Sequence, residues 1–319
     1  MENIDKIGVL GDLHLTSHNP ERRKDNYFDT AIIKLYQSLE AFKRNNCHHI
    51  LQVGDFFDSP QVSRSVDARM IRLLNEYPEM KFYCCYGQHD IFGHSKSTLP
   101  NSPLSVLESA GLLKIADENP ITLGKCNFWS CNSDIDVYGA SFGEDIPKPM
   151  YSHHFNILIT HRQIGNRQLW PGQELENPRC FLRDHPDYNI VLCGDYHYSF
   201  VDRLKQQIIL NPGALMRQSI TDIESGLKPA AYIVYIDTNI LDYLRIDLPF
   251  QKAEDVFDLT KKEQSKNSEA LNKLIEDLRN SSLKNKRDWK RILLRVQEEK
   301  QASQGSISFI NAAMEELKI

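Results

Sequence analysis

Two stretches in different halves of this 319-residue sequence follow one pattern. In IGVLGDLH an apolar run ends in glycine, Asp12, one further residue and His14, and in NIVLCGDYH another apolar run ends the same way at Asp195 and His197. A short apolar run closed by glycine is typical of a buried strand that turns sharply at its end. Side chains at i and i+2 of an extended chain point the same way, so each Asp-x-His pair is predicted to present an oxygen and an imidazole to one point.

The first part of the chain alternates strand-like and helix-like segments. The apolar runs KIGVLG, HILQVGD and KFYCCYG are separated by amphipathic stretches over 26–46 and 63–76, which predicts the β-α-β units of an α/β fold. Further strands are predicted at CNFWSC, IDVYGA, FNILIT, NIVLCG, QQIILN, AAYIVYI and LDYLRIDL. Few helices separate the last four of these, which favours hairpins at the edge of a sandwich.

The sequence changes character after Pro249. Strand-like runs cease, and helical periodicity appears over 268–280, 286–300 and 306–317. We therefore expect one domain over residues 1–250 and a helical C-terminal region over 251–319. Three interpretations of that region stay open: a partner-binding module, helices folded back on their own domain, or a direct DNA contact through the basic segment 284–295.

Chemically active side chains follow five of the predicted strands. They are Asp12 and His14, Asp55, Gln88 and His89, His161, and Asp195 and His197. The carboxyl ends of strands line one rim of an α/β sheet, so these side chains are expected to converge there, with the two Asp-x-His pairs arriving from opposite flanks of the sheet. Mixed oxygen and nitrogen donors suit divalent ions such as Mn²⁺, Fe²⁺ or Zn²⁺.

Asp55 has a distinct part in this prediction. Two metal ions about 3.5–4 Å apart need a shared ligand, and a carboxylate with two oxygens can bridge them. Such a pair of ions polarises a phosphoryl group, lowers the pKa of a bound water and neutralises charge on the departing oxygen. The strand-end residues therefore predict phosphoester hydrolysis.

The order and separation of these motifs resemble a known family. GDLH, GDFFD, GQHD, ITH and GDYH are similar to the five sequence blocks of the calcineurin-like metallophosphoesterases, over roughly residues 5–250. Their contexts GDFFDSP and NPGALMRQS are most similar to the SbcD-type DNA repair exonucleases, and the short C-terminal region is similar to that of compact phage-type relatives. The resemblance implies a four-layered α/β/β/α sandwich with a helical C-terminal appendage, and a metal-dependent DNA nuclease that serves an SbcCD-like repair or recombination complex.

The resemblance also implies a role for each motif residue. It places one metal on Asp12, His14, Asp55 and His197, and a second on Asp55, Gln88 and His161 with help from Asp195. It assigns His89 to protonate the leaving oxygen. Two neighbours, Asp58 and Asp90, are expected to brace the ligands, and Arg162 and Arg217 are candidate contacts to phosphate or DNA. The expected cofactors are two divalent ions, Mn²⁺ first, with Mg²⁺ or Fe²⁺ as alternatives.

Two positions depart from the family pattern. Gln88 stands where the family has asparagine, and Asp195 stands where it has the first histidine of G-H-x-H. Both positions fall on the same metal. A longer amide and a shorter carboxylate can be accommodated by a small displacement of that ion, and the added negative charge favours Mn²⁺ or Mg²⁺. Slower chemistry or loss of the second metal are the other outcomes of these changes.

Composition limits the partners and the location. The net charge of −5 argues against a protein coated with basic surface, so a DNA-binding function must depend on the site. The seven cysteines suggest no disulfide framework or zinc motif, and the N-terminus shows no leader, so we expect a cytoplasmic protein that has no membrane segment. The expected partners are DNA, an SbcC-type coiled-coil ATPase bound through 251–319, and a second copy in a homodimer.

Two other functions are open at this point. The first is a phosphodiesterase or phosphatase for small molecules, which would show little salt dependence of substrate affinity. The second is a catalytically degenerate scaffold that binds DNA or the ATPase without cutting, which predicts weak binding of the second metal because of Gln88 and Asp195.

Overall fold

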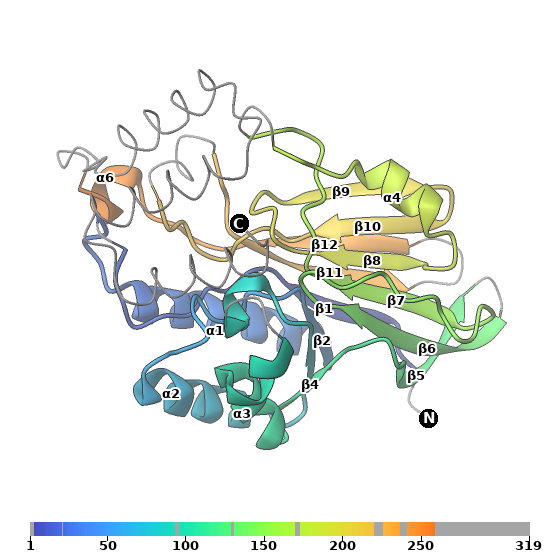
Figure 1. Ribbon diagram of the computed structural model, residues 1–319, viewed down its shortest axis with the longest axis horizontal. Coiled ribbons are helices and arrows are strands. Elements are labelled where there is room, and N and C mark those ends of the chain that lie inside the picture. The colour runs from blue at the N-terminus through green and yellow to red at the C-terminus, as the bar shows by residue number, and fades with distance from the viewer. Residues whose placement is uncertain are drawn as a thin grey trace, which may run out of the picture. The chain divides into compact units, whose positions relative to one another are not determined.

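The computed structural model describes residues 3–20, 22–92, 96–128, 131–169, 173–219, 226–236 and 241–258 (Figure 1). The chain divides into two units, Met1–Leu259 and Thr260–Ile319, and the described residues all belong to the first. The helices predicted over 268–280, 286–300 and 306–317 lie outside the described residues. The helical C-terminal region therefore stays a prediction.

The strands and helices alternate through the first part of the chain, as the β-α-β prediction requires. The strands are β1 Lys6–Leu10, β2 His49–Gln52, β3 Lys81–Cys84, β4 Leu113–Ile115, β5 Ile121–Phe128, β6 Cys131–Ala140, β7 Phe155–Thr160, β8 Ile190–Cys193, β9 Phe200–Leu204, β10 Gln207–Asn211, β11 Ala230–Ile236 and β12 Leu241–Asp247. The helices are α1 Tyr27–Arg44, α2 Arg64–Asn75, α3 Pro103–Ser109, α4 Pro178–Asp184 and α6 Ala253–Val256, with the 3₁₀ helices η1 Gln88–Asp90 and η3 Lys96–Asn101.

The strands form two sheets. The first sheet has the order β12-β11-β1-β2-β3-β4, and the second has the order β5-β6-β7-β8-β10-β9 (Figure 1). The pairs β1–β2, β2–β3 and β3–β4 are parallel, as are β6–β7, β7–β8 and β8–β10. Antiparallel strands form one edge of the first sheet, β11 and β12, and both edges of the second, β5 and β9.

Alternate residues of the central strands face different layers. In β2, Ile50 belongs to the core between the first sheet and α1–α3, whereas Leu51 belongs to the core between the two sheets. In β8, Leu192 joins the core between the sheets and Val191 packs with Phe181 of α4. Because successive side chains of a strand point to opposite faces, each sheet is buried on both sides. The layers are α/β/β/α, which confirms the predicted sandwich.

The two longest helices of the described residues match their predicted ranges. The prediction over 26–46 corresponds to α1, which begins where the Asn26 side chain accepts a hydrogen bond from the Asp29 backbone N–H. The prediction over 63–76 corresponds to α2, whose apolar residues Val66, Met70 and Leu73 are buried. In the described part of the chain, no helix has the length and hydrophobicity needed to cross a membrane.

Three details of the predicted sheet are wrong. CNFWSC is not one strand, because β5 ends at Phe128 and β6 begins at Cys131 to form a hairpin. The short strands β4 and β9 were not predicted, because their three and five residues carry a weak periodic signal. The two Asp-x-His motifs follow β1 and β8, which belong to different sheets, so they do not approach from flanks of one sheet.

Candidate metal centre

The loops after β1, β2, β3, β7 and β8 carry the predicted ligands and meet at one end of the two sheets. Backbone hydrogen bonds join the first two loops: the N–H groups of Leu13 and His14 both donate to the Asp55 carbonyl oxygen at 3.0 Å. A further hydrogen bond joins the loop after β8, in the second sheet, to the loop after β1: the Asp195 N–H donates to Asp12 Oδ2 at 3.2 Å. The convergence that the sequence predicted is therefore present, although two sheets supply it.

Asp12, His14 and His197 form one group of candidate metal ligands. One ligand atom from each of the three side chains lies within 4.8 Å of the others. His14 Nε2 is 3.2 Å from His197 Nε2, and the latter is 3.8 Å from Asp12 Oδ2. Two ring nitrogens facing each other beside a carboxylate are an arrangement that a divalent cation would stabilise.

Asp55 lies between this group and His161. Its Oδ2 atom is 3.7 Å from His14 Nε2 and 3.2 Å from His161 Nε2. The other oxygen, Oδ1, accepts a hydrogen bond from the His89 backbone N–H at 2.8 Å. One carboxylate oxygen is thus held by the backbone while the other faces both imidazoles, which is the position a bridging ligand requires.

A second contact orients the His161 ring. His161 Nδ1 donates to the Val53 carbonyl oxygen at 2.7 Å, which leaves Nε2 facing Asp55. A metal-binding histidine commonly has its second nitrogen held in this way, because the hydrogen bond fixes the tautomer and the ring orientation. The ring and the carboxylate are both buried, so their positions are set by the packing around them.

The buried polar atoms of the cluster indicate whether a cation would fit between the candidate ligands. Asp12 Oδ1 is buried and has no hydrogen-bond partner among the described residues, and the buried atoms Asp55 Oδ2 and His161 Nε2 face each other at 3.2 Å. A buried polar atom without a partner costs roughly 1–3 kcal/mol, and more when it is charged. Since these atoms belong to one cluster of oxygen and nitrogen donors, the residues present fit the divalent ions that the sequence predicted.

The charges in the cluster depend on one another. Burial raises the pKa of Asp12 to about 7. Burial also opposes ionisation of His161, but the carboxylates of Asp55 and Asp12 outweigh it and raise the pKa of that imidazole to about 10. His161 and His14 in turn hold the pKa of Asp55 below its ordinary value against the effect of burial. A bound cation would replace the His161 proton as the charge that stabilises the carboxylates.

The backbone at the candidate ligands is not extended as the sequence analysis assumed. His14, Asp55 and Asp195 have φ angles of 45°, 49° and 67°, in the left-handed region that residues other than glycine rarely adopt. The prediction that an extended backbone aligns the side chains of both Asp-x-His motifs is therefore wrong. Instead, each strand ends in a sharp turn, and such strain is typical of functional sites, where the surrounding structure compensates for it.

Two glycines allow the ligand loops to pack closely. A Cβ atom on Gly87 would lie 2.1 Å from Asp55 Oδ1 and 2.2 Å from the Asp55 backbone nitrogen. A Cβ atom on Gly194 would lie 2.6 Å from Asp12 Oδ1 and 2.8 Å from His161 Nδ1. No side chain can occupy those positions without moving the candidate ligands, which explains why glycine precedes these motif residues.

Gln52 is a residue of the site that the sequence motifs did not predict. It is buried at the end of β2, and its Nε2 atom donates to the carbonyl oxygens of Gly11 at 3.1 Å and Gly54 at 2.5 Å. Its Oε1 atom accepts from the Gly54 N–H at 3.1 Å. The side chain thus links the loops that carry Asp12 and Asp55. The available signal was an amide within the apolar run HILQV, where a polar residue needs buried partners.

His89 lies beside the cluster and is held by backbone atoms. Its Nδ1 atom donates to the Asp58 carbonyl oxygen at 3.1 Å, and its ring centroid is 5.0 Å from that of His14. His14, Asp58 and His89 also form a second group whose potential ligand atoms lie within 4.8 Å of one another. The His89 Nδ1 contact leaves Nε2 as the nitrogen available for proton transfer.

The two predicted bracing residues contact the loops that carry the ligands. Asp58 Oδ1 is 3.4 Å from His14 Nδ1 and accepts a hydrogen bond from Gln218 Nε2 at 3.0 Å. Asp90 is fully buried and accepts from three backbone N–H groups, those of Phe56, Phe57 and Gly87, at 3.2, 3.0 and 2.9 Å. Asp90 therefore joins the loop after β2 to the loop after β3.

Gln88 and Asp195, the two residues that depart from the family pattern, contact each other. Gln88 Nε2 donates to Asp195 Oδ1 at 3.2 Å. Both side chains are half-buried. Burial raises the pKa of Asp195, and the Asp55 carboxylate adds to the effect while His161 opposes it. The amide that was predicted as a ligand therefore presents its N–H group to the carboxylate that was predicted as its neighbour on the same metal.

The two candidate phosphate-binding arginines point to other partners. Arg162 Nη1 is 3.7 Å from Glu176 Oε2, and its Nη2 atom donates to the Glu144 carbonyl oxygen at 3.3 Å. Arg217 lines a separate cavity near α1. No contact of either guanidinium with the predicted metal ligands is found among the described residues, so their role in phosphate binding stays a prediction.

The sequence matches a known family of proteins over most of its length. A family model described as calcineurin-like phosphoesterase superfamily domain matches residues 6–228, and the chain belongs to that superfamily. The superfamily uses a dinuclear site for divalent metals, and the candidate ligands described above supply suitable donors. Membership implies metal-dependent hydrolysis of phosphoester bonds. Among curated proteins, none matches this sequence.

Several solved structures are similar to this chain over most of its length. The protein TT1561 of Thermus thermophilus is 10% identical with a TM-score of 0.48, and the match covers 76% of this chain and 99% of that one. A dimetal phosphatase from Danio rerio is 10% identical with a TM-score of 0.47, over 78% and 100% of the two chains. An archaeal phosphodiesterase is 16% identical with a TM-score of 0.39, over 76% and 99%. These similarities are too remote to assign a substrate.

Proposed function

We propose that this protein is a metal-dependent DNA nuclease of the SbcD type, which hydrolyses phosphodiester bonds as the nuclease subunit of an ATPase-linked repair or recombination complex. The observation that carries the hydrolytic part is the position of His89. Its backbone N–H binds Asp55 Oδ1 and its ring binds the Asp58 carbonyl oxygen, so the imidazole is fixed at the border of the candidate metal centre.

In this proposal the residues of the cluster bind the metal ions or donate a proton. Asp12, His14, Asp55 and His197 would hold one divalent ion, and Asp55, Gln88 and His161, with Asp195, would hold the other. When bound, the ions supply Lewis acidity and neutralise charge on the phosphoryl group. His89 would give the proton on Nε2 to the leaving oxygen, a contribution worth about 10²–10⁴-fold in rate for a well-placed general acid.

We propose DNA as the substrate because the sequences around two of the motifs, GDFFDSP and NPGALMRQS, resemble those of SbcD-type nucleases. The segment NPGALMRQS borders the cluster, because the Leu215 N–H donates to the Asp12 carbonyl oxygen at 2.8 Å. Within GDFFDSP, Asp58 holds His89 and contacts His14. The two segments that resemble SbcD-type nucleases thus lie next to the site where a substrate would be cleaved. This position supports DNA as the proposed substrate.

Two other candidates are each favoured by one observation. The net charge of −5 favours a small-molecule phosphodiesterase or phosphatase, because proteins that bind DNA through its phosphates usually present basic surface. The hydrogen bond from Gln88 to Asp195 favours a degenerate scaffold, since the amide N–H cannot coordinate a cation.

One experiment separates the three functions. End-labelled single-stranded and double-stranded DNA and bis-p-nitrophenyl phosphate are incubated with the full chain and Mn²⁺, using wild type, His89→Ala and His153→Ala. His153 is an exposed histidine outside the cluster and serves as the matched control. We expect DNA cleavage that requires Mn²⁺, falls about 10²–10⁴-fold in His89→Ala and is unchanged in His153→Ala.

The other results of this experiment would contradict the proposal. Turnover of the small diester without cleavage of DNA would identify the small-molecule enzyme. No turnover of either substrate at saturating Mn²⁺ would identify the scaffold. Equal activity of His89→Ala and wild type would remove His89 from the mechanism.

The partners and the location belong to the same proposal. We infer that residues 251–319 bind a coiled-coil ATPase, although those beyond 258 lie outside the described residues. A homodimer within the same complex stays a prediction. The seven cysteines are all free thiols, which supports a reducing compartment such as the cytoplasm. Co-purification of the full chain with the ATPase, compared with a chain truncated after residue 258, tests the partner.

A further inference from the structure

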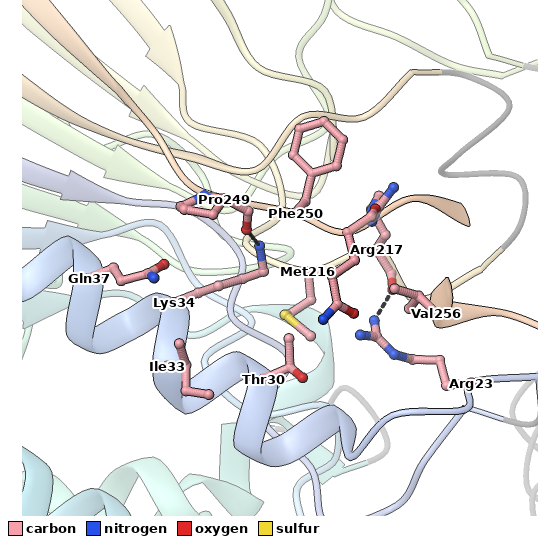
Figure 2. Close-up of a pocket in the computed structure, with 11 residues that line it drawn as sticks. Arg23, Thr30, Ile33, Lys34, Gln37, Met216, Arg217, Pro249, Phe250 and Val256 are labelled. Atoms are coloured by element: carbon pink, nitrogen blue, oxygen red, sulfur yellow. Dashed lines mark hydrogen bonds between the residues drawn. The ribbon is translucent and has the colours of Figure 1, made fainter. Parts of the chain in front are cut away.

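A second cavity lies beside α1, apart from the predicted metal ligands. It has a volume of about 280 Å³ and opens between α1 and the segment 249–256 that follows β12 (Figure 2). Ligand pockets of roughly 300–1,000 Å³ are usual, so this cavity is just below the lower limit of that range. Among the described residues, the cationic side chains that line it are Arg23, Lys34 and Arg217. We call it the cationic pocket.

Backbone carbonyl groups hold these cations in place. Lys34 Nζ donates to the Pro249 carbonyl oxygen at 2.6 Å, as the dashed line in Figure 2 shows. Arg217 Nη2 donates to the Gln251 carbonyl oxygen at 2.6 Å, and Arg23 Nη1 donates to the carbonyl oxygen of Arg217 at 2.5 Å. A carbonyl group orients a cation but carries no net charge, so the contact with Pro249 does not neutralise the charge of Lys34.

The carboxylate of Asp25 is already engaged by Arg23 and Thr30. Asp25 binds Arg23 in a two-point contact of 2.8 and 2.7 Å and accepts a third hydrogen bond from Thr30 Oγ1 at 2.7 Å. Lys34 is only 6% exposed, and among the described residues it forms no ion pair with a carboxylate. Burial, together with repulsion from Arg217 and Arg23, lowers the pKa of Lys34 to about 8. An anion would relieve both the burial and the repulsion of these charges.

The rest of the lining mixes polar residues, Thr30, Gln37 and Gln251, with apolar ones. Ile33, Met216 and Val256 contribute aliphatic surface, and Phe250 contributes an aromatic ring that is 47% exposed. The Arg217 guanidinium lies 4.7 Å from the centroid of that ring. A guanidinium stacked on an aromatic ring directs its N–H groups outward in its own plane, where an anion can accept from them. The pocket therefore combines cations with apolar surface in one small volume.

We propose that the cationic pocket binds the phosphate group of a small molecule, with Lys34 and Arg217 contacting the phosphate and Phe250 contacting an apolar or aromatic body. A nucleoside monophosphate has this combination of chemistry and is the size class that such a volume admits. The site is additional to the metal centre and does not depend on the function proposed above. It shares one segment with the centre, because Arg217 follows Leu215, whose N–H binds the Asp12 carbonyl oxygen.

Protection of Lys34 from acylation tests this proposal at the site itself. The metal-loaded full chain is treated briefly with an acetylating reagent at about pH 8, where the Lys34 amine is partly unprotonated, and the extent of acetylation is read from peptides by mass spectrometry. Adenosine 5′-monophosphate, inorganic phosphate and adenosine are added in parallel. Lys43 is the control, since it lies on the same helix but pairs with Glu79 at 3.1 Å.

We expect the monophosphate to lower acetylation of Lys34 about tenfold at ten times its dissociation constant and to leave Lys43 unchanged. Arg217→Met should abolish this protection while the unliganded protein still labels at Lys34. Equal protection by inorganic phosphate would show that the ligand is the phosphate alone and would still support the site. Protection by adenosine alone, or acetylation of Lys34 that no phosphate compound changes, would overturn the proposal.

Unfolding of a variant would not obscure the result. The wild-type measurement is sufficient by itself, because it compares three added compounds on one folded protein. Binding of phosphate at the metal centre does not imitate the expected result either, since the readout is the modification of Lys34 and not the loss of activity.

Discussion

Gln88 Nε2 donates a hydrogen bond to Asp195 Oδ1 across 3.2 Å, so the two residues that depart from the family pattern are partners of each other. The glutamine amide reaches one methylene further than asparagine, and the aspartate is shorter than the histidine it replaces. The extra length at one position therefore offsets the missing length at the other. The two changes act as one coupled alteration of the candidate metal centre.

Asp195→Asn should weaken Mn²⁺ binding. The substitution keeps the shape of the side chain and removes a negative charge from the cluster, so we expect the affinity to fall about 10–100-fold, as when groups that support metal ligands are changed. Isothermal titration calorimetry with Mn²⁺ measures the affinity and the number of ions bound. Asp145→Asn, at an exposed aspartate, is the matched control. An affinity equal to that of wild type would place Asp195 outside the metal centre.

Gly87→Ala should disturb the cluster through Asp55. The added Cβ atom would lie 2.1 Å from Asp55 Oδ1 and 2.2 Å from its backbone nitrogen, so the loop after β2 must move. We expect a loss of roughly 1–3 kcal/mol in the free energy of unfolding, as for other overpacked sites, together with weaker Mn²⁺ binding. Gly111→Ala, where φ is 73° and no atom lies within 4 Å of the new Cβ, should cost stability without changing Mn²⁺ affinity. The prediction fails if the two variants bind Mn²⁺ alike.

Removal of divalent ions should lower the thermal stability. The buried Asp12 Oδ1 atom has no hydrogen-bond partner among the described residues and is destabilising without a cation. An ion that binds only the folded state at a hundred times its dissociation constant adds about 2.7 kcal/mol. Scanning calorimetry with chelator and then with excess Mn²⁺ measures the change in Tm. Asp55→Ala should abolish most of this response. A wild-type Tm that is independent of Mn²⁺ would argue against a metal centre.

Lys34 should make stability depend on pH in the alkaline range. Its pKa is about 8 in the folded protein against 10.5 ordinarily, so between these values the unfolded chain binds the proton and the folded chain does not. Stability from this residue therefore rises as pH increases from 8 to 10.5, by up to about 3 kcal/mol. Denaturant unfolding of wild type and Lys34→Met at both ends of the range measures the effect. As pH rises, the free energy of unfolding should increase more for the wild type than for Lys34→Met. An equal pH dependence of the two proteins would contradict the lowered pKa of Lys34.

Much of the fold could be predicted from local patterns. The apolar run KIGVLG became β1, and the amphipathic stretch over 26–46 became α1, because strand and helix periodicity arise from the geometry of neighbouring residues. The candidate ligands were also predictable one by one, since Asp12, Asp55 and His161 each follow a strand. The weak strands β4 and β9 escaped, because three to five residues carry too little periodicity to distinguish them from loops.

The sequence by itself determined which strands and helices form and which polar residues follow the strands, because those features depend on short-range patterns. Only the tertiary structure decided that β1 and β8 belong to different sheets, that Gln88 meets Asp195, and that Lys34 and Arg217 line one pocket. Each of these relationships joins segments far apart in the chain. Such contacts depend on how two sheets and their helices pack, and no pattern within a single segment records that packing.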